Sequence, residues 1–419
     1  MNETIVKAHI TGFAAYMKEF GRMSFSEKML VFLYLFSMVP IIYMIFYGMN
    51  SRLGLSAINE ALQAIVFTVL AMLSFTQLWK ELKWWDVLFV VACALGYIMS
   101  PQIYPQTFLD VLLNASEFLL TVLPFYIIGA SIDLRKQSNT LLHVGRIGIL
   151  ITLFLILLER MAGFSFNFYE EEENMGQAYR LLIPLMIVTW NALRKPNMFD
   201  MVLFFIGLLM LLGFGTRGPV LSLAIFIILM LFIKTKDLGV KVGFVIVGVL
   251  LFVFLEPIVN FFSEIMAMFG MSDRVLADMS NIGEATSSGR DNIWGDALDL
   301  IIKNGAQGEG LYADRSFVII NGEGTYVHNF FLEVGVNFGL YIGLLVSLVV
   351  LFVFFYDFRK LKGTEFLTLL IAIFCFGFLP LMISGSYLAS SMFWLLLGVS
   401  AKVMRTPRAY YLGTEQYHT

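Results

Sequence analysis

The sequence predicts an all-α polytopic membrane protein, and three observations carry that prediction. Hydrophobic residues make up 59% of the chain and charged residues 14%, against about 45–50% and about 25% in soluble domains. Apolar runs long enough to cross a bilayer, about 20 residues each, recur along most of the chain. Lys and Arg gather in alternate connections between these runs. A soluble fold of this composition would have too few charged residues to cover its surface.

About twelve apolar runs have the length of transmembrane helices. The third and sixth are short, and the tenth is interrupted by Gly335 and Gly339, which predicts a bent or two-part helix. Because the count is even, both chain ends are expected on one side of the membrane. The predicted spans begin near Met29, Glu60, Asp86, Phe108, Leu141, Arg180, Met198, Pro219, Gly239, His328, Glu365 and Tyr387.

The distribution of basic residues predicts the orientation. Of the 28 Lys and Arg residues, 19 fall on the side of the N-terminus and 8 on the opposite side, with Arg146 inside the fifth span. Short loops rich in Lys and Arg stay in the cytoplasm, so both termini are predicted to be cytoplasmic. The predicted regions are a cytoplasmic segment 1–28, spans one to nine in 29–255, an extracytoplasmic loop domain 256–326, spans ten to twelve in 327–404 and a cytoplasmic tail 405–419.

Residues 256–326 form the longest polar stretch between spans. They are rich in Gly, Asp, Asn and Ser, and such a segment cannot cross hydrocarbon because its charges and unpaired backbone groups cost several kcal/mol each. Residues 264–280 and 292–303 have the apolar spacing of short helices. Another outer connection, 159–179, carries four consecutive glutamates from Glu170, which form either a solvated loop or a site for a cation.

Arginine dominates the outer basic residues: seven of the eight are arginines. The planar guanidinium binds phosphate oxygens bidentately, so these arginines predict a phosphate or diphosphate ligand, the alternative being interfacial anchors that reach to lipid headgroups. Arg217 lies in a tight turn between two apolar spans. Arg180 opens the sixth span, and Arg290 lies in a polar part of the long loop.

His328 is the only histidine predicted on the outer side. An imidazole with a pKa of about 6.5 can take a proton from a sugar hydroxyl near neutral pH, so His328 is the candidate general base; the alternative is a helix-start residue bonded to the loop. Asn329 and Glu333 are one helical turn apart, so Glu333 would either support the site through Asn329 or simply satisfy the hydrogen bonding of Asn329. Glu117, deep in the fourth span, serves either a hydrophilic cavity or a structural hydrogen bond.

No metal, nucleotide or other cofactor is expected. The sequence holds no HExxH, no paired cysteines with zinc spacing and no DxD, and Gly308–Gly310 follows no strand, so it predicts a turn and not a dinucleotide loop. The net charge of −3 gives no indication of nucleic acid.

Four motifs occur in one order along the chain. Gly215–Gly218 closes a span, Ser288-Gly289-Arg290 and Trp294 follow in the long loop, then come Gly308–Arg315 and His328–Glu333. Over Leu211–Leu345 this set resembles the O-antigen ligase and polymerase superfamily, whereas the first half of the chain matches only in hydropathy.

The resemblance implies a GT-C-type integral-membrane glycosyltransferase of the bacterial inner membrane, with its active site on the extracytoplasmic side. Its donor would be an undecaprenyl-diphosphate-linked glycan. Arg217 and Arg290 would bind the diphosphate, His328 would lie at the reacting centre, and Arg315 would be a further substrate contact. Arg180, Trp294, Tyr312, Asn329 and Glu333 complete the expected substrate-binding set, with the aromatic faces and loop carboxylates such as Asp314 directed at sugar hydroxyls.

The sequence favours a polysaccharide polymerase for O-antigen, capsule or exopolysaccharide, which moves the growing glycan onto a lipid-linked repeat unit with inversion. Alternatives with the same donor are an O-antigen ligase acting on lipid A core and an oligosaccharyltransferase acting on protein. A lipid-linked-oligosaccharide flippase would instead concentrate charge near the midplane in both halves of a repeat. Expected partners are the lipid-linked oligosaccharide, membrane lipid, a chain-length regulator and a flippase, and no nucleic acid.

Overall fold

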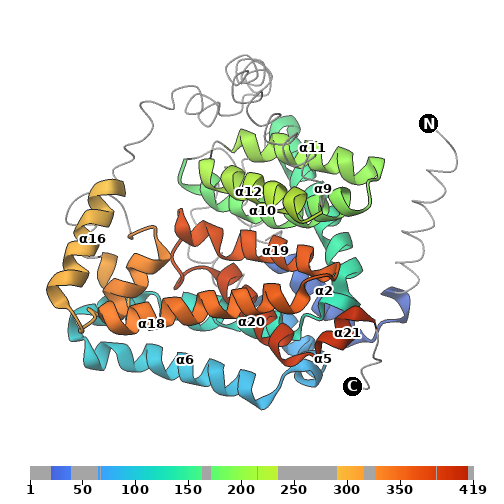
Figure 1. Ribbon diagram of the computed structural model, residues 1–419. Helices are drawn as coiled ribbons and strands as arrows, with labels where there is room; N and C mark the ends of the chain where they lie inside the picture. The colour runs from blue at the N-terminus through green and yellow to red at the C-terminus, as the bar shows by residue number, and fades with distance from the viewer. Residues whose placement is uncertain are drawn as a thin grey trace, which may run out of the picture.

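The computed structural model describes residues 20–38, 65–66, 68–162, 171–214, 216–234, 290–315, 326–383 and 385–413, and every regular element within these ranges is a helix. Long helices lie side by side, and α16 stands across one end of the bundle (Figure 1). The elements are α2 Phe25–Met38, α5 Phe75–Glu81, α6 Trp84–Ile103, η1 Pro105–Thr107, α7 Phe108–Leu113, the π-helical η2 Glu117–Val122, α8 Pro124–Ser131, α9 Leu134–Ala162, α10 Glu171–Arg194, α11 Met198–Gly213, α12 Arg217–Lys234, α16 Arg290–Asn304, α18 Phe330–Leu361, α19 Phe366–Gly377, η3 Leu379–Met382, α20 Ser391–Arg405 and α21 Arg408–Leu412.

Several helices are apolar enough for a bilayer. Within the described ranges, Trp84–Ile103, Leu134–Leu157 and Phe330–Leu361 are long and apolar enough to cross a membrane, and Pro105–Leu113 with Glu117–Ser131 passes the same test as one span bent by 54°. The shorter helices Met198–Gly213, Gly218–Ile233 and Phe366–Met382 are also apolar. The described residues are therefore helical and compatible with a membrane protein, as predicted, while the number of twelve spans stays a prediction.

The exposed faces of two helices indicate where lipid lies. Only 17% of the apolar stretch of α6 and 28% of that of α18 is buried inside the protein, and Leu344, Leu348 and Phe352 stand more than half exposed along α18. Contiguous apolar surface of this size is unfavourable in water. These faces are suited to contact acyl chains.

Most predicted spans coincide with a described helix, but α9 and α10 begin several residues before the predicted starts near Leu141 and Arg180. The predicted starts near Glu60 and Gly239 lie outside the described residues. The span predicted to begin near Arg180 is part of a helix that already begins at Glu171, so the acidic run predicted as a loop reaches into a first helical turn. Glutamates are favourable there because they complement the partial positive charge of a helix N-terminus.

Glycines let α8 and α20 pack backbone against backbone. A Cβ on Gly129 would lie 2.1 Å from the Leu395 carbonyl oxygen, and one on Gly398 would lie 2.1 Å from that of Tyr126. Small residues at such crossings allow close approach where lipid tails supply no hydrophobic driving force. This contact joins the first half of the chain to α20, near its C-terminal end.

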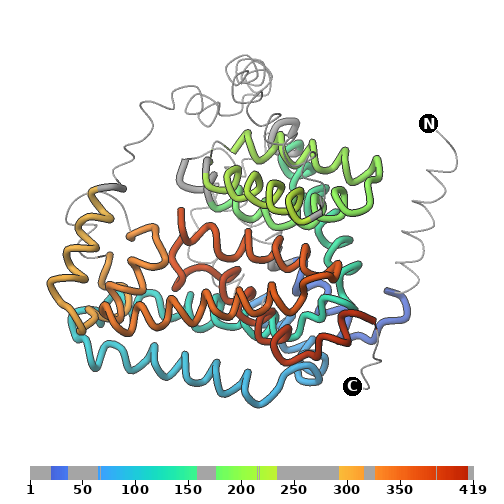
Figure 2. Tube along the Cα trace, viewed as in Figure 1, coloured from blue at the N-terminus to red at the C-terminus, as the bar shows by residue number. Residues whose placement is uncertain are grey.

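The chain segments of α5 and α21 lie at the opposite end of the bundle from α16 (Figure 2). Two ion pairs lie near that end. Lys402 pairs with Glu81, and Arg405 pairs with the buried Asp86 while also donating to the Ala130 carbonyl at 2.6 Å. Arg146, inside α9, pairs with Asp200 of α11 at 2.7 Å. A charge placed within an apolar helix is tolerated when it is paired in this way.

The predicted interruption of the tenth span is confirmed at Gly339. Gly339 has φ +79° and divides α18 into two helical segments. A Cβ on Gly343 would lie 2.8 Å from the Cα of Gly335, so the two segments touch through glycine. The break frees backbone carbonyls, and the loop supplies their donors: Glu309 N donates to Val336 O at 2.9 Å and Gly310 N to Asn337 O at 3.1 Å. Non-helical backbone at membrane depth requires such satisfaction.

The helix predicted over 292–303 is confirmed as α16, and it packs on the first segment of α18. Ile293, Ala297 and Ile301 form a small buried cluster with Ala313, Val327 and Val336. This cluster holds together α16, the following residues 305–315, and the start of α18. The second predicted loop helix, 264–280, lies outside the described residues.

Candidate functional site

Val327, the residue before His328, is hydrogen-bonded through both its N–H and its carbonyl. The fully buried Val327 donates its N–H to Asp314 Oδ2 at 3.2 Å, and its carbonyl accepts from the indole Nε1 of Trp294 at 3.0 Å. We call these two bonds the Val327 clamp. His328 itself adopts φ 56°, a left-handed conformation that is uncommon outside glycine. Its half-buried imidazole packs on the Tyr326 ring, with centroids 4.2 Å apart. The clamp therefore fixes the chain entering the candidate base.

Residues 305–315 rest on the corner between α6 and α7. Leu311 N donates to Ser100 Oγ at 3.4 Å, and Gln106 Nε2 donates to the Glu309 carbonyl at 3.1 Å. A Cβ on Gly310, which has φ +94°, would lie 2.6 Å from the Tyr104 Cβ. Only glycine combines that conformation with so close an approach. The motif Gly308–Arg315 is thus seated on the first half of the chain.

Asp314 is almost fully buried, with 1% of its surface exposed. Burial raises the pKa of its carboxyl to about 6, opposed by the Val327 amide and the nearby Arg315 charge. Its Oδ1 has no hydrogen-bond partner among the described residues. Asp314 was expected to face sugar hydroxyls from the loop surface, and that expectation is wrong because the carboxylate turns inward to the clamp.

Tyr312 is also buried, at 2% exposed, so the expected open aromatic face for a glycan is not formed. Its ring instead lies under the Arg315 guanidinium at 4.2 Å, and its hydroxyl lies 3.4 Å from that of Tyr97. Burial raises the pKa of the Tyr312 hydroxyl well above its usual value. The neutral phenol therefore acts as a support for Arg315.

Asn329 and Glu333 have different partners from those expected. Asn329 caps α18: its Oδ1 accepts from the amides of Phe331 at 3.0 Å and Leu332 at 3.4 Å. The buried Glu333 carboxylate accepts from Ser386 Oγ and, at 3.1 Å, from the Tyr387 amide. The expected support of Asn329 by Glu333 is therefore not formed. Glu333 ties the start of α18 to the loop before α20 instead.

The structure gives the backbone positions of the predicted site arginines but not all of their side chains. Arg290 is the first residue of α16 and Arg217 the first of α12, and their side chains lie outside the described residues. Arg290 precedes Trp294 by one helical turn, about 6 Å along the axis, so the N-terminus of α16 approaches the Val327 clamp. Arg180 is half-buried on α10, which packs on α9, α11, α12 and α19.

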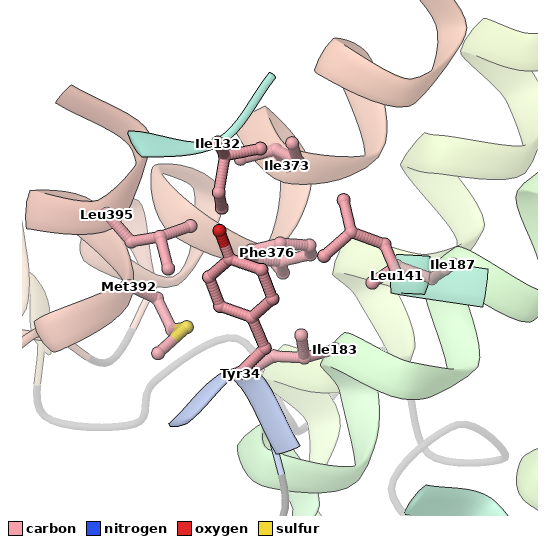
Figure 3. A pocket seen from close by; sticks show the side chains of 9 residues that line it. All are labelled: Tyr34, Ile132, Leu141, Ile183, Ile187, Ile373, Phe376, Met392 and Leu395. Carbon is pink, nitrogen blue, oxygen red and sulfur yellow. The ribbon is translucent and has the colours of Figure 1, made fainter. Parts of the chain in front are cut away.

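A buried cavity lies elsewhere, between α2, α9, α10, α19 and α20 (Figure 3). Its volume of about 10 Å³ is about that of a single water, and aliphatic side chains such as Ile132, Ile187 and Leu395 surround the Tyr34 ring. The Tyr34 hydroxyl donates to Gln137 Oε1 at 2.8 Å. This cavity is a packing gap of the core and holds no candidate chemistry.

The motif-bearing residues coincide with a family model. Residues 202–341 match the model described as O-antigen ligase. The matched residues run from within α11 to just past the bend at Gly339, about a third of the chain. No curated protein and no solved structure matches the chain.

Over residues 202–341 the O-antigen ligase match is consistent with the superfamily predicted from the motifs. This family covers O-antigen ligase and polymerase-like enzymes, which are membrane glycosyltransferase-like proteins. Its model ends before α19 and α20 and begins after α6 and α7. The helices that seat the Gly308–Arg315 motif therefore lie outside the matched region.

Sequence reasoning missed the residues of the first half that touch this site. Ser100 and Gln106 contact the loop, and Asn114 Oδ1 accepts from Arg315 Nη1 at 2.9 Å. The signals were present as polar residues and prolines interrupting apolar runs near Pro101 and Pro105. Nothing in the sequence relates them to Arg315, because the contact spans about two hundred residues.

The Val327 clamp gives a testable prediction at Asp314. Asp314→Asn keeps an acceptor for the Val327 amide, so its activity should stay within about threefold of wild type, whereas Asp314→Ala leaves that buried N–H unpaired. Such a loss costs about 1–3 kcal/mol and frees the chain before His328. Thermal melting of the purified protein and an assay of glycan transfer measure the two effects. Equal behaviour of the two variants would contradict the clamp.

The pH dependence of stability should also report on Asp314. Because the pKa is raised in the folded state, the protonated carboxyl favours folding: its contribution is full below the unfolded pKa of about 3.9 and is lost as pH rises through about 6. Asp314→Asn carries no such charge. Its melting temperature relative to wild type should therefore increase between pH 4 and pH 7.

Proposed function

We propose that the protein is a polysaccharide polymerase of the outer face of the bacterial inner membrane. It transfers a glycan from undecaprenyl diphosphate onto a lipid-linked repeat unit, on a GT-C-type scaffold of about twelve spans with both termini cytoplasmic. The observation that carries the proposal is the meeting of Trp294, Asp314 and His328 at the Val327 clamp. Three motifs separated along the chain meet there at Val327, the residue before the half-buried His328.

The reaction follows from the residue types. His328 takes the proton of an acceptor hydroxyl on the new repeat unit while that oxygen attacks C1 of the growing glycan. The C1–O bond to diphosphate breaks, and undecaprenyl diphosphate leaves from the opposite face, so the configuration at C1 is inverted. Arg217 and Arg290 stabilise the negative charge that grows on the leaving oxygen, and Arg315 adds to the same electrostatic field. The donor glycan is already activated by its bond to diphosphate, which is a good leaving group, so the reaction needs no nucleotide.

Ligation is the second candidate, and the family description favours it. In that reaction the same donor glycan passes to lipid A core. The described part of the long loop, 290–315, holds three basic residues, Arg290, Lys303 and Arg315, and two of them are assigned to the donor. A phosphorylated core acceptor would require more positive charge than this, which favours the lipid-linked repeat unit as acceptor.

Purified protein given only the lipid-linked repeat unit, without metal or nucleotide, should produce a ladder of lengthened lipid-linked glycans. Gel electrophoresis and mass spectrometry of the products measure this directly. A protein that gives no ladder but joins the glycan to lipid A core when core is supplied is a ligase, and the polymerase assignment then fails.

A further inference from the structure

A break lies in the span from Pro105 to Ser131, beside the candidate site. Pro105–Leu113 and Glu117–Ser131 meet at 54°, and the turn after the break, Glu117–Val122, is π-helical. Such turns are rare and are frequent at functional sites. Polar residues at a break within an apolar span must be buried in protein or line an aqueous cavity. Asn114 is the first residue of this break.

The Asn114 amide is oriented by contacts on both of its ends. Its Nδ2 donates to the Asp110 carbonyl at 2.7 Å, and its Oδ1 accepts from Arg315 Nη1 at 2.9 Å. A guanidinium can only donate, which fixes which end of the amide faces Arg315. Asn114 therefore holds the guanidinium from the side of the first half of the chain.

The Tyr312 ring packs against one face of the same guanidinium. Its ring lies 4.2 Å from the Arg315 Cζ, and its own backbone adopts φ 65°, which is strained for a tyrosine. The neighbouring Tyr97 hydroxyl, 3.4 Å from that of Tyr312, donates to the Val111 carbonyl at 2.8 Å. The support of Arg315 is thus built from two helices of the first half as well as from the motif itself.

The direct partners of Arg315 are an amide oxygen and an aromatic ring, and neither is a carboxylate. Arg146, Arg194 and Arg405 each pair with a carboxylate within 2.8 Å, whereas no carboxylate lies within ion-pair distance of Arg315 in the described part of the chain. An amide oxygen and an aromatic face orient a guanidinium without cancelling its charge. The half-buried Arg315 keeps further N–H groups for an anion.

We propose that Asn114 is a positioning residue of the donor site, which holds Arg315 toward the diphosphate of the lipid-linked substrate. This inference rests on the proposed function for the identity of the anion. It explains why an amide suits this position: an aspartate would pair with Arg315 and compete with the diphosphate. The broken span Pro105–Ser131, which lies outside the matched family region, thereby forms one wall of the anion site.

The test compares Asn114→Asp with Asn114→Ala in full-length protein reconstituted in lipid nanodiscs. Asn114→Asp should raise KM for the lipid-linked repeat unit about tenfold and weaken inhibition by inorganic pyrophosphate to the same degree. Because Arg315 also helps to stabilise the charge on the leaving oxygen, kcat should decrease as well. The melting temperature should not decrease, because the new carboxylate pairs with Arg315. Asn114→Ala, which only frees the guanidinium, should weaken pyrophosphate inhibition less than Asn114→Asp does.

Two further variants complete the design. Gln137→Glu makes the same amide-to-acid change at the hydrogen bond to Tyr34, away from the site, and should not alter pyrophosphate inhibition. Arg315→Gln should weaken pyrophosphate inhibition as much as Asn114→Asp does. When the two changes are combined, pyrophosphate inhibition should be no weaker than in Arg315→Gln alone. Additive losses, or pyrophosphate inhibition of Asn114→Asp equal to that of wild type, would overturn the proposal.

The outcome separates this inference from the proposed function. If wild type transfers glycan and needs His328, but Asn114→Asp binds pyrophosphate normally, the positioning role alone fails. If wild type transfers no glycan, direct binding of labelled pyrophosphate to wild type and Asn114→Asp replaces inhibition as the readout. A tenfold difference would then support the anion site without the transferase, and equal binding would overturn it.

Discussion

His328→Ala should lower the rate of glycan transfer by about 10²–10⁴-fold, the usual contribution of a positioned general base. The imidazole is half-buried beside Tyr326, and the Val327 clamp fixes the chain that carries it. Because the base acts on the acceptor hydroxyl and not on the diphosphate, binding of the lipid-linked donor should persist. The loss should therefore appear in kcat with little change in KM.

Single-turnover assays with purified variants measure this effect, and donor binding is followed separately with labelled undecaprenyl-diphosphate-linked glycan. His143→Ala is the matched control, because His143 lies within α9 and not in the loop that carries His328. It should transfer glycan at a rate close to that of wild type. A His328→Ala protein with nearly full turnover would assign that residue to the start of α18 as a structural group.

Arg217→Lys should reduce kcat/KM by about 10²-fold, comparable to the loss of one preorganised donor at a developing negative charge. Lysine keeps the positive charge but lacks the planar fork that binds two phosphate oxygens at once. Arg217 begins α12, where the N-terminal amides of a helix also favour an anion. Arg290→Ala, at the start of α16, should cause a loss of similar size.

Arg194→Lys is the control for Arg217→Lys. Arg194 bonds Glu365, which is about half exposed, and such pairs contribute little. That variant should keep normal turnover, and protein levels in the membrane should be equal for all variants. If Arg217→Lys retained the wild-type kcat/KM, an interfacial anchor would be the better description of Arg217.

The sequence was sufficient for those features that depend on local patterns. Apolar runs predicted the helices α6, α11, α18 and α19 to within a few residues, since burial or lipid contact requires such runs. Gly335 and Gly339 predicted the division of α18 because a left-handed residue ends a helix. The spacing of apolar residues predicted α16. The family followed from the order of motifs between Gly215 and Glu333.

Long-range contacts could not be predicted in this way. Asp314 looked like a surface carboxylate because its neighbours are polar, and only the fold shows that it turns inward to Val327. Asn114 looked like one polar residue in an apolar run, and its partner Arg315 is 201 residues away along the chain. Glu333 accepts hydrogen bonds from Ser386 and Tyr387 and not from Asn329, whose side chain caps α18.

The central claim is that glycosyl transfer from a lipid diphosphate takes place at the site around His328. The most direct measurement is the release of undecaprenyl diphosphate by purified protein supplied only with lipid-linked repeat units, followed together with bond formation and the configuration at C1. The account predicts one undecaprenyl diphosphate released for each new glycosidic bond, with inversion at C1, and formation of both products slowed about 10²–10⁴-fold in His328→Ala. Movement of intact lipid-linked glycan across the membrane with no release of undecaprenyl diphosphate would contradict the account and indicate a transporter.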